Sequence, residues 1–299
     1  MYTRLLIPLD ESTLAEQALP YGRTLAETLA LPVELVEAVD PEAYSAMLDP
    51  GQGRYLDTLV ADGIERGRRY LERIASSFAG TRVSCWAGVG KPEETVIGRA
   101  AADRGTLIVM ATHGRSGIQR WLLGSVAEKV VHGAANHVLL IRASERPPPA
   151  ERAVLESVIV PLDGSPVAEQ ALPSVVELAR RMNLKVILLR AYAPPPAATA
   201  DEHGSYFEKL IAQIEEEARR YLSAQAEALE AKGLRDVAVA VELGYGAEEI
   251  ITLARKTPNN LIAMCTHGRS GVGRWLLGSV TERVVRHSGD PVLVIRAQG

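Results

Sequence analysis

Apolar positions along the chain follow two alternating patterns. Short continuous runs, such as LLIPL near the first residue, are bounded by turn residues and are typical of buried strands. Between them, apolar residues recur every three or four positions, as at Leu14, Ala18, Leu25 and Leu29, which is typical of amphipathic helices. In the first half these patterns predict strands at 4–9, 33–38, 83–87, 107–110 and 137–142, with helices between them, including 93–104 and 125–132.

The second half repeats the same order of elements. Its predicted strands are 157–162, 186–191, 237–242, 261–264 and 291–296, and its helices include a long one around 207–222, then 247–256 and 279–287. Alternation of strands and helices predicts an α/β fold with a parallel sheet and helices on both faces. Because crossovers between parallel strands are right-handed, each half is expected to be a five-stranded, doubly wound, Rossmann-like domain.

Two long stretches show that the halves are copies. RLLIPLDESTLAEQALP at 4–20 recurs as SVIVPLDGSPVAEQALP 153 residues later, and THGRSGIQRWLLGSV at 112–126 recurs as THGRSGVGRWLLGSV 154 residues later. A period this long indicates tandem domains rather than a solenoid. Three consecutive prolines at 147–149 predict a stiff linker. We therefore predict domains at 1–145 and 153–299, joined by the linker 146–152.

Composition narrows the function classes. The net charge of −4 argues against a protein that binds nucleic acid through a basic face. The two cysteines of the chain are too few for a disulfide framework or a zinc site. No apolar run approaches the length of a membrane span, and the first residues do not resemble a signal peptide, so we expect a cytoplasmic protein without membrane or nucleic-acid partners.

The repeated polar segments fall where such folds bind ligands. In doubly wound sheets, ligands lie beyond the carboxyl ends of the strands where the strand order reverses. The PLD sequence follows the first strand of each half, and THGRSG follows the fourth. Gly114 and Gly117 permit a tight turn close to a ligand, and Gly124-Ser125 opens a helix whose free amides suit a phosphate. Arg115 and Arg269 add a possible charge-assisted contact.

Simpler structural roles compete with a ligand role. Ser125 with Glu128, and Ser279 with Glu282, fit a capping box that closes the helix start without a ligand. Asp10 and Asp163 fit caps of the following helices. The isolated histidines His113 and His267 favour a loop or ligand contact over metal binding, and the tryptophans of the two RWLLG segments favour packing.

Catalytic motifs are missing from the sequence. No GxGxxG follows the first strand, the Walker A spacing fails around Lys91, and there is no GxSxG or HExxH. The sequence therefore predicts binding rather than turnover, with no catalytic residue and no metal site.

At these residues the chain resembles the universal stress protein family in its tandem, ATP-binding form. The resemblance rests on IPLDES and VPLDGS, the THGRSG loops, the GSVAEKVV and GSVTERVV helix starts, and the final HVLLIR and PVLVIR strands. Members of that branch hold ATP with the pattern Gly-x2-Gly-x9-Gly-Ser/Thr. Here Ala111 and Cys265 replace the first glycine, and the bulkier Cys265 leads us to expect a less well-formed second site.

The resemblance implies a fold like that of the adenine nucleotide alpha hydrolases, with one site in each domain for ATP, alone or with Mg²⁺. The aspartates and the alanines after the second strands would meet adenosine, and the glycine and serine amides would meet the phosphates. In the first domain the implied site residues are Pro8, Leu9, Asp10, Ala38, Met110, Ala111, His113, Gly114, Arg115, Gly124, Ser125, Val126 and Ala127. In the second they are Pro161, Leu162, Asp163, Ala191, Met264, Cys265, His267, Gly268, Arg269, Gly278, Ser279, Val280 and Thr281.

By the same resemblance, we expect a stress-response protein that acts through nucleotide-dependent interaction with a protein partner, as yet unidentified, and not as an enzyme. Pairing through the last strands would make the chain a homodimer or pair its two domains with each other. Two alternatives remain open at this point: a nucleotide-independent interaction scaffold and a weak ATP hydrolase.

Overall fold

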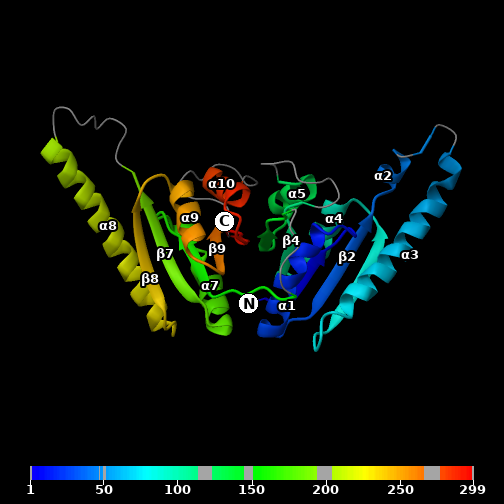
Figure 1. The fold of residues 1–299 in the computed structure, drawn as a ribbon, viewed down its shortest axis with the longest axis horizontal. Helices are drawn as coiled ribbons and strands as arrows, with labels where there is room; N and C mark the ends of the chain where they lie inside the picture. Colours follow the sequence, from blue (N-terminus) through cyan, green and yellow to red (C-terminus); the bar gives the residue numbers. More distant parts are fainter. Residues whose placement is uncertain are drawn as a thin grey trace. The chain divides into compact units, whose positions relative to one another are not determined.

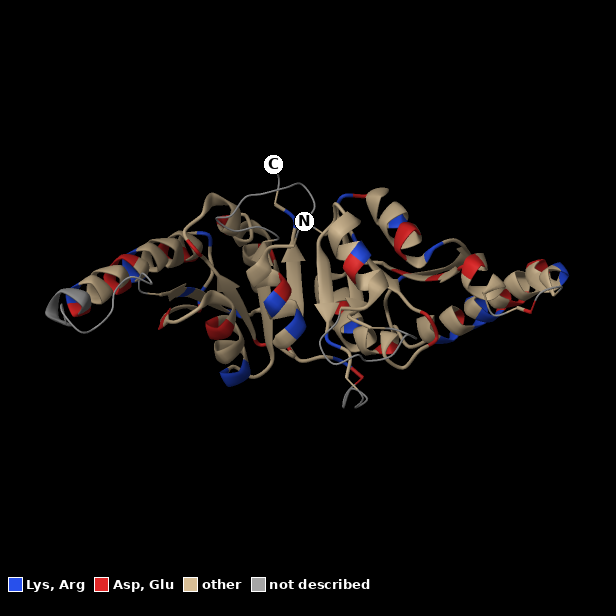
Figure 2. Ribbon diagram, turned by 90° about the horizontal axis from the view of Figure 1, so that it is seen from above, with Lys and Arg blue, Asp and Glu red and all other residues tan. Residues whose placement is uncertain are grey.

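The computed structural model describes residues 2–46, 48–49, 52–113, 123–144, 151–193, 204–265 and 277–297. The chain divides into two compact units, Met1–Val154 and Leu155–Gly299 (Figure 1). Each unit contains one parallel five-stranded sheet, and helices lie on both faces of the sheet (Figure 2). The predicted α/β architecture of two tandem Rossmann-like domains is confirmed.

In the first unit the strand order is β3-β2-β1-β4-β5, and every pairing is parallel. The buried strand β1 lies at the centre, where Leu5 is in register with Val33 of β2 and Leu107 of β4. The elements are β1 (Arg4–Pro8), the 3-10 helix η1 (Ala15–Ala18), α1 (Leu19–Leu29), β2 (Val33–Val39), α2 (Pro41–Ser45), η2 (Gly53–Tyr55), α3 (Leu56–Ala75), β3 (Val83–Val89), α4 (Pro92–Ala101), β4 (Thr106–Ala111), α5 (Ser125–Gly133) and β5 (Val138–Ile141).

The second unit repeats this topology with the order β10-β9-β6-β7-β8. Its central strand β6 is buried between β7 and β9. The elements are β6 (Ser157–Pro161), α6 (Pro166–Glu169), α7 (Leu172–Met182), β7 (Lys185–Tyr192), α8 (Gly204–Ala231), β8 (Val237–Leu243), α9 (Gly246–Lys256), β9 (Asn260–Cys265), α10 (Ser279–His287) and β10 (Val292–Ile295).

The first helix of each unit is broken where the apolar spacing predicts a continuous one. In the first unit the chain forms η1 and then starts α1 at Leu19, with Pro20 in its first turn. The second unit breaks in the same way between α6 and α7, with Pro173 in the first turn of α7. Proline has no N–H for the helix ladder but fits the first turn, where that group has no intrahelical partner. The proline therefore starts a new helix.

A buried ionic cluster stands at the amino end of the first sheet. Glu34 is 6% exposed, and its carboxylate accepts hydrogen bonds from Arg4 Nη1 at 2.5 Å and from Arg99 Nε at 2.8 Å. The Arg99 guanidinium also stacks on Trp86, 4.5 Å from the ring centroid. In the second unit the matching positions carry Ser157, Ile187 and Leu253. The same place in the fold is therefore ionic in one copy and mostly apolar in the other.

Within the described ranges, no helix combines the length and apolar composition needed to cross a lipid bilayer.

The ionic cluster around Glu34 can be tested with a matched control, because the second unit has other residues at the same positions. We expect Glu34→Ile to lower the free energy of unfolding of the first unit by about 2–3 kcal/mol, because it leaves two partly buried guanidiniums without their carboxylate. The triple variant Arg4→Ser, Glu34→Ile, Arg99→Leu reproduces the second unit's residues, so it should recover most of that loss. Urea denaturation followed by circular dichroism measures both. Equal losses in the single and triple variants would contradict this account.

Candidate functional site

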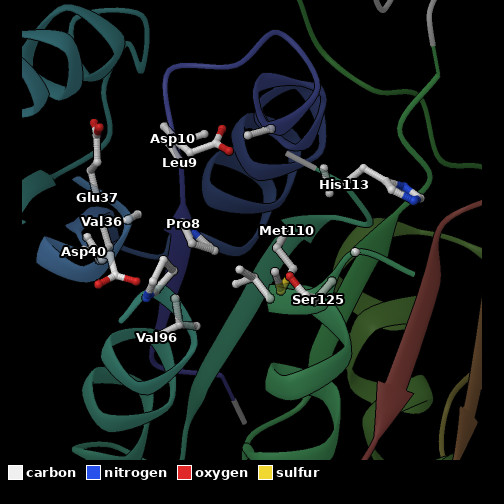
Figure 3. A pocket seen from close by; sticks show the side chains of 18 of the residues that line it. Pro8, Leu9, Asp10, Val36, Glu37, Asp40, Val96, Met110, His113 and Ser125 are labelled. Atoms are coloured by element: carbon white, nitrogen blue, oxygen red, sulfur yellow. The ribbon is translucent and has the colours of Figure 1, made fainter. Parts of the chain in front are cut away.

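A cavity of about 300 Å³ opens in the first unit beyond the carboxyl ends of β1 and β4. Figure 3 shows Asp10 after β1, Met110 on β4 and Ser125 at the start of α5 gathered around this space. The sheet order changes direction here, as the fold rule requires for a ligand crevice. Every described residue of the predicted first site lines the cavity: Pro8, Leu9, Asp10, Ala38, Met110, Ala111, His113, Gly124, Ser125, Val126 and Ala127.

The second unit has an equivalent cavity of about 290 Å³. Cys265 lines it at the position of Ala111, yet the two volumes are nearly equal, so the larger side chain does not close the cavity. The described residues of the predicted second site all contribute to the lining: Pro161, Leu162, Asp163, Ala191, Met264, Cys265, Gly278, Ser279, Val280 and Thr281.

Part of each predicted site lies outside the described residues. These predictions concern the turn glycines, the arginines and the second histidine of the repeated loops, together with their tryptophans. The residues are Gly114, Arg115, Gly117, Trp121, His267, Gly268, Arg269 and Trp275.

The aspartate after the first strand organises the loop that follows it. Asp10 Oδ1 accepts hydrogen bonds from Ser12 N at 3.2 Å and Ser12 Oγ at 2.5 Å, and Ser12 Oγ in turn accepts one from Ala15 N at 3.1 Å. Asp163, Ser165 and the Ala168 amide repeat the arrangement. Ser165 is thus the N-cap residue of α6, whereas the N-cap residue of η1 is Leu14, without a side-chain cap. The interpretation of the aspartates as direct caps is wrong. The aspartates hold the serines and line the cavities.

The capping-box reading of Ser125 and Ser279 is also wrong. Gly124 and Gly278 are the N-cap residues of α5 and α10, and no side-chain cap is formed at either position. Each serine is the first helical residue, one position too late for its hydroxyl to act as the cap. The first residues of both helices therefore line their cavities, and no side chain of the N-cap residue accepts a hydrogen bond from their amides.

Gly124 is required by a close backbone approach. Its N–H donates to the Thr112 carbonyl at 2.8 Å. A Cβ built on it would lie 2.8 Å from the same carbonyl oxygen and 3.4 Å from His113 Cα, both of them backbone atoms that cannot move aside cheaply. Its φ of −60° is open to any residue, so space and not conformation demands glycine.

The short helix α2 forms a wall of the first cavity that we did not predict. Asp40 and Tyr44 contribute to the lining, and Asp40 caps α2 by accepting from Glu42 N at 2.9 Å. Asp followed by Pro is a helix-start signal that could have revealed it. Further residues line the cavities that we did not predict from the sequence. In the first unit they are Ala15, Val36, Glu37, Val39, Asp40, Ala43, Tyr44, Pro92, Val96 and Thr112. In the second unit they are Ala168, Leu189, Gly246 and Ile250.

Polar contacts hold α2 in place from two sides. Arg66 of α3 donates to the Tyr44 hydroxyl at 2.8 Å and to Glu11 Oε1 at 3.2 Å. On the other side, Lys91 Nζ lies 3.1 Å from Glu42 Oε2. Contacts between exposed charges are individually weak. Together they connect α2 to the loop after β1, to α3 and to the start of α4.

The shared AEQALP segment has a packing role. Tyr70 of α3 donates to Glu16 at 3.0 Å, and Tyr221 of α8 donates to Glu169 at 2.7 Å, so one glutamate anchors the long helix in each unit. Burial, followed by the neighbouring carboxylate, raises the pKa of both tyrosines, which therefore remain protonated donors. Gln17 adds a pair of hydrogen bonds to the backbone of Ser144 at 2.6 and 2.9 Å.

Among the described residues, no group of three or more His, Cys, Asp or Glu side chains is arranged to hold a metal ion.

Known proteins resemble both halves of the chain. The sequence profile of the universal stress protein family matches residues 1–142 and 155–296. A universal stress protein of Mycolicibacterium smegmatis is 24% identical over 306 residues, which cover 98% of this chain and 96% of that protein. One from Methanocaldococcus jannaschii is 31% identical over 142 residues, or 47% of this chain and 82% of the relative. The crystal structure of an Archaeoglobus fulgidus universal stress protein has a TM-score of 0.72 at 20% identity, covering 98% of both chains.

The thiol in the second cavity gives a pH-dependent signal. Burial raises the pKa of Cys265 to about 12, so at neutral pH the group is almost entirely the unreactive thiol. In a Cys85→Ser variant, which leaves Cys265 as the one cysteine of the chain, we expect iodoacetamide alkylation to accelerate about tenfold per pH unit between pH 7 and 9, since the thiolate fraction rises tenfold per unit below the pKa.

Mass spectrometry of quenched samples measures the rate, and urea-unfolded protein supplies the rate of an ordinary thiol. An ordinary thiol pKa of about 8.5 gives a rise of only about threefold between pH 8 and 9, so a rise that small in the folded protein would show that the pKa is not raised.

Proposed function

The chain belongs to the universal stress protein family, and on that premise we propose that each of its two units binds ATP. Family membership supports a role in the stress response. In the proposed function, the bound nucleotide controls an interaction with a protein partner, and its hydrolysis is not required.

One observation carries the proposal. In each unit, a helix start without a side-chain cap and an aspartate after the first strand open onto a single cavity of about 300 Å³. A helix N-terminus offers amide donors and a positive dipole end to phosphate oxygens. A carboxylate at the other side can accept hydrogen bonds from the hydroxyl or amino groups of a nucleoside. The cavity volume lies at the lower end of the range for small-ligand sites.

Different residues of each cavity would contact the phosphates and the base of the nucleotide. The amides at Gly124 and Ser125, and at Gly278 and Ser279, would receive the phosphates. The apolar lining, which includes Val96 in the first unit and Ile250 in the second, would exclude water from the base. Mg²⁺, if it accompanies ATP, would be held mainly by phosphate oxygens, as is usual for nucleotide-bound magnesium.

A direct measurement of binding tests the proposal. We expect isothermal titration of the full chain with ATP to show saturable binding at two sites, because both cavities have the same helix start and aspartate. Heat absent up to millimolar ATP would leave the nucleotide-independent scaffold as the better description. Chromatography of the nucleotide after incubation separates a binding protein, which returns ATP, from a weak hydrolase, which returns ADP.

A matched pair of glycine substitutions tests the phosphate end. We expect Gly124→Ala to weaken ATP binding in the first unit at least tenfold, because the new Cβ would displace the backbone of Thr112 and the start of α5. Gly98→Ala is the control, since a Cβ at that exposed position on α4 meets no atom within 4 Å. Titration calorimetry compares the two variants. Loss of affinity in both, or in neither, would contradict the assignment.

A further inference from the structure

An exposed aromatic side chain adjoins the lining of the second cavity, at a position where the first unit has a lysine. Tyr245 is 72% exposed and is the N-cap residue of α9. It stands directly before Gly246, which lines the cavity. Leu243 and Val280, 54% and 41% exposed, are further large apolar residues of this region, and Val280 itself lines the cavity. An aromatic ring left in water at the rim of a cavity has apolar surface available for a ligand.

The backbone of Tyr245 is held by hydrogen bonds, while its side chain is exposed to solvent. Its carbonyl accepts hydrogen bonds from Glu248 N at 2.9 Å and Glu249 N at 3.1 Å. On its far side, a Cβ built on Gly246 would approach only Val280, at 3.8 Å, an ordinary contact. Glycine at this position therefore leaves open the space between Tyr245 and the start of α10.

The matching position of the first unit is built differently. Gly90 and Gly244 have nearly the same φ, 159° and 157°, and mark the same turn after the edge strand. Lys91 follows in the first unit, where its ammonium lies 3.1 Å from a carboxylate oxygen of Glu42. Pro92 then occupies the place of Gly246 and lines the first cavity with its ring. The first unit thus has a cation tied to α2 where the second has an exposed ring beside a glycine.

The walls of the two cavities also differ in polarity at the end of the second strand of each unit. In the first cavity Glu37 and Asp40 contribute to the lining at the end of β2. The corresponding residues of the second unit are Arg190 and Ala193, and neither contributes to the lining of its cavity. At this end Leu189, Ala191 and Ile250 supply apolar contacts instead. From the described residues, a base bound there would have apolar surface on its sides.

We propose that Tyr245 is a base-contacting residue of the second cavity, which turns over the mouth and stacks on the adenine ring. This inference rests on the proposed function, since it needs a nucleotide with its base on the α9 side. Stacking of a base on an aromatic side chain tolerates any base because every base has a π face. The second unit therefore holds its nucleotide by stacking at a position where the first unit has no aromatic ring.

The experiment uses the full chain with Cys85→Ser at pH 9, where more of the Cys265 thiol is ionised than at neutral pH, and alkylation of Cys265 reports occupancy of the second cavity alone. ATP should protect Cys265, and the concentration for half protection measures affinity at that site. We expect Tyr245→Ala to raise this concentration about tenfold or more, the usual effect of losing one stacking partner. Tyr245→Phe keeps the ring and should stay within about twofold of the parent. Lys91→Ala, the matched change in the first unit, should have no effect.

Inorganic tripolyphosphate separates stacking from a general effect on the mouth. It lacks a base, so Tyr245→Ala should leave its half-protection concentration unchanged. An equal loss for ATP and tripolyphosphate would overturn the stacking role, as would an unchanged ATP affinity in Tyr245→Ala. Absence of any protection by ATP in the parent, together with the absence of binding heat, would instead refute the proposed function, and this inference with it.

Discussion

Both cavities depend on one constraint, the right-handed crossover between parallel strands. The connections that lead from β1 to β2 and from β3 to β4 leave the sheet on opposite faces, so that neither of these two connections covers the space beyond the carboxyl ends of β1 and β4. The Asp10 loop and the start of α5, more than a hundred residues apart in sequence, meet there. The strand order thus sets the position of the site. The second unit has its cavity at the same position, beyond β6 and β9.

Much of this arrangement could be predicted from the sequence because the strands are buried. Strands such as β4 and β9, buried along their whole length, read as continuous apolar runs, and their boundaries agree with the prediction within one or two residues. The position of the aspartates follows from the strand that precedes them. The place of the cavity follows from the strand order, which the alternation of strands and helices already indicates.

Two features could not be predicted: the residue at which helix α5 begins, and the position of helix α2, which depends on tertiary contacts. The capping box matches the letters of Ser125 and Glu128, but the helix begins at the serine itself, a shift of one residue that sequence patterns do not resolve. Helix α2 has an Asp-Pro start signal, but it is only one turn long, and its place beside the cavity depends on contacts with Arg66 and Lys91 of other elements. Contacts of this kind are invisible to local periodicity.

The ionic cluster around Glu34 has a thermal consequence. The cost of removing charged groups from water falls as temperature rises, whereas the stabilisation from apolar burial per unit area reaches a plateau. The first unit, which buries Glu34 between two arginines, therefore loses less of this local stability on heating than the second, which places Ile187 there. The same position of the fold therefore depends on two different interactions in the two copies, and these respond differently to temperature.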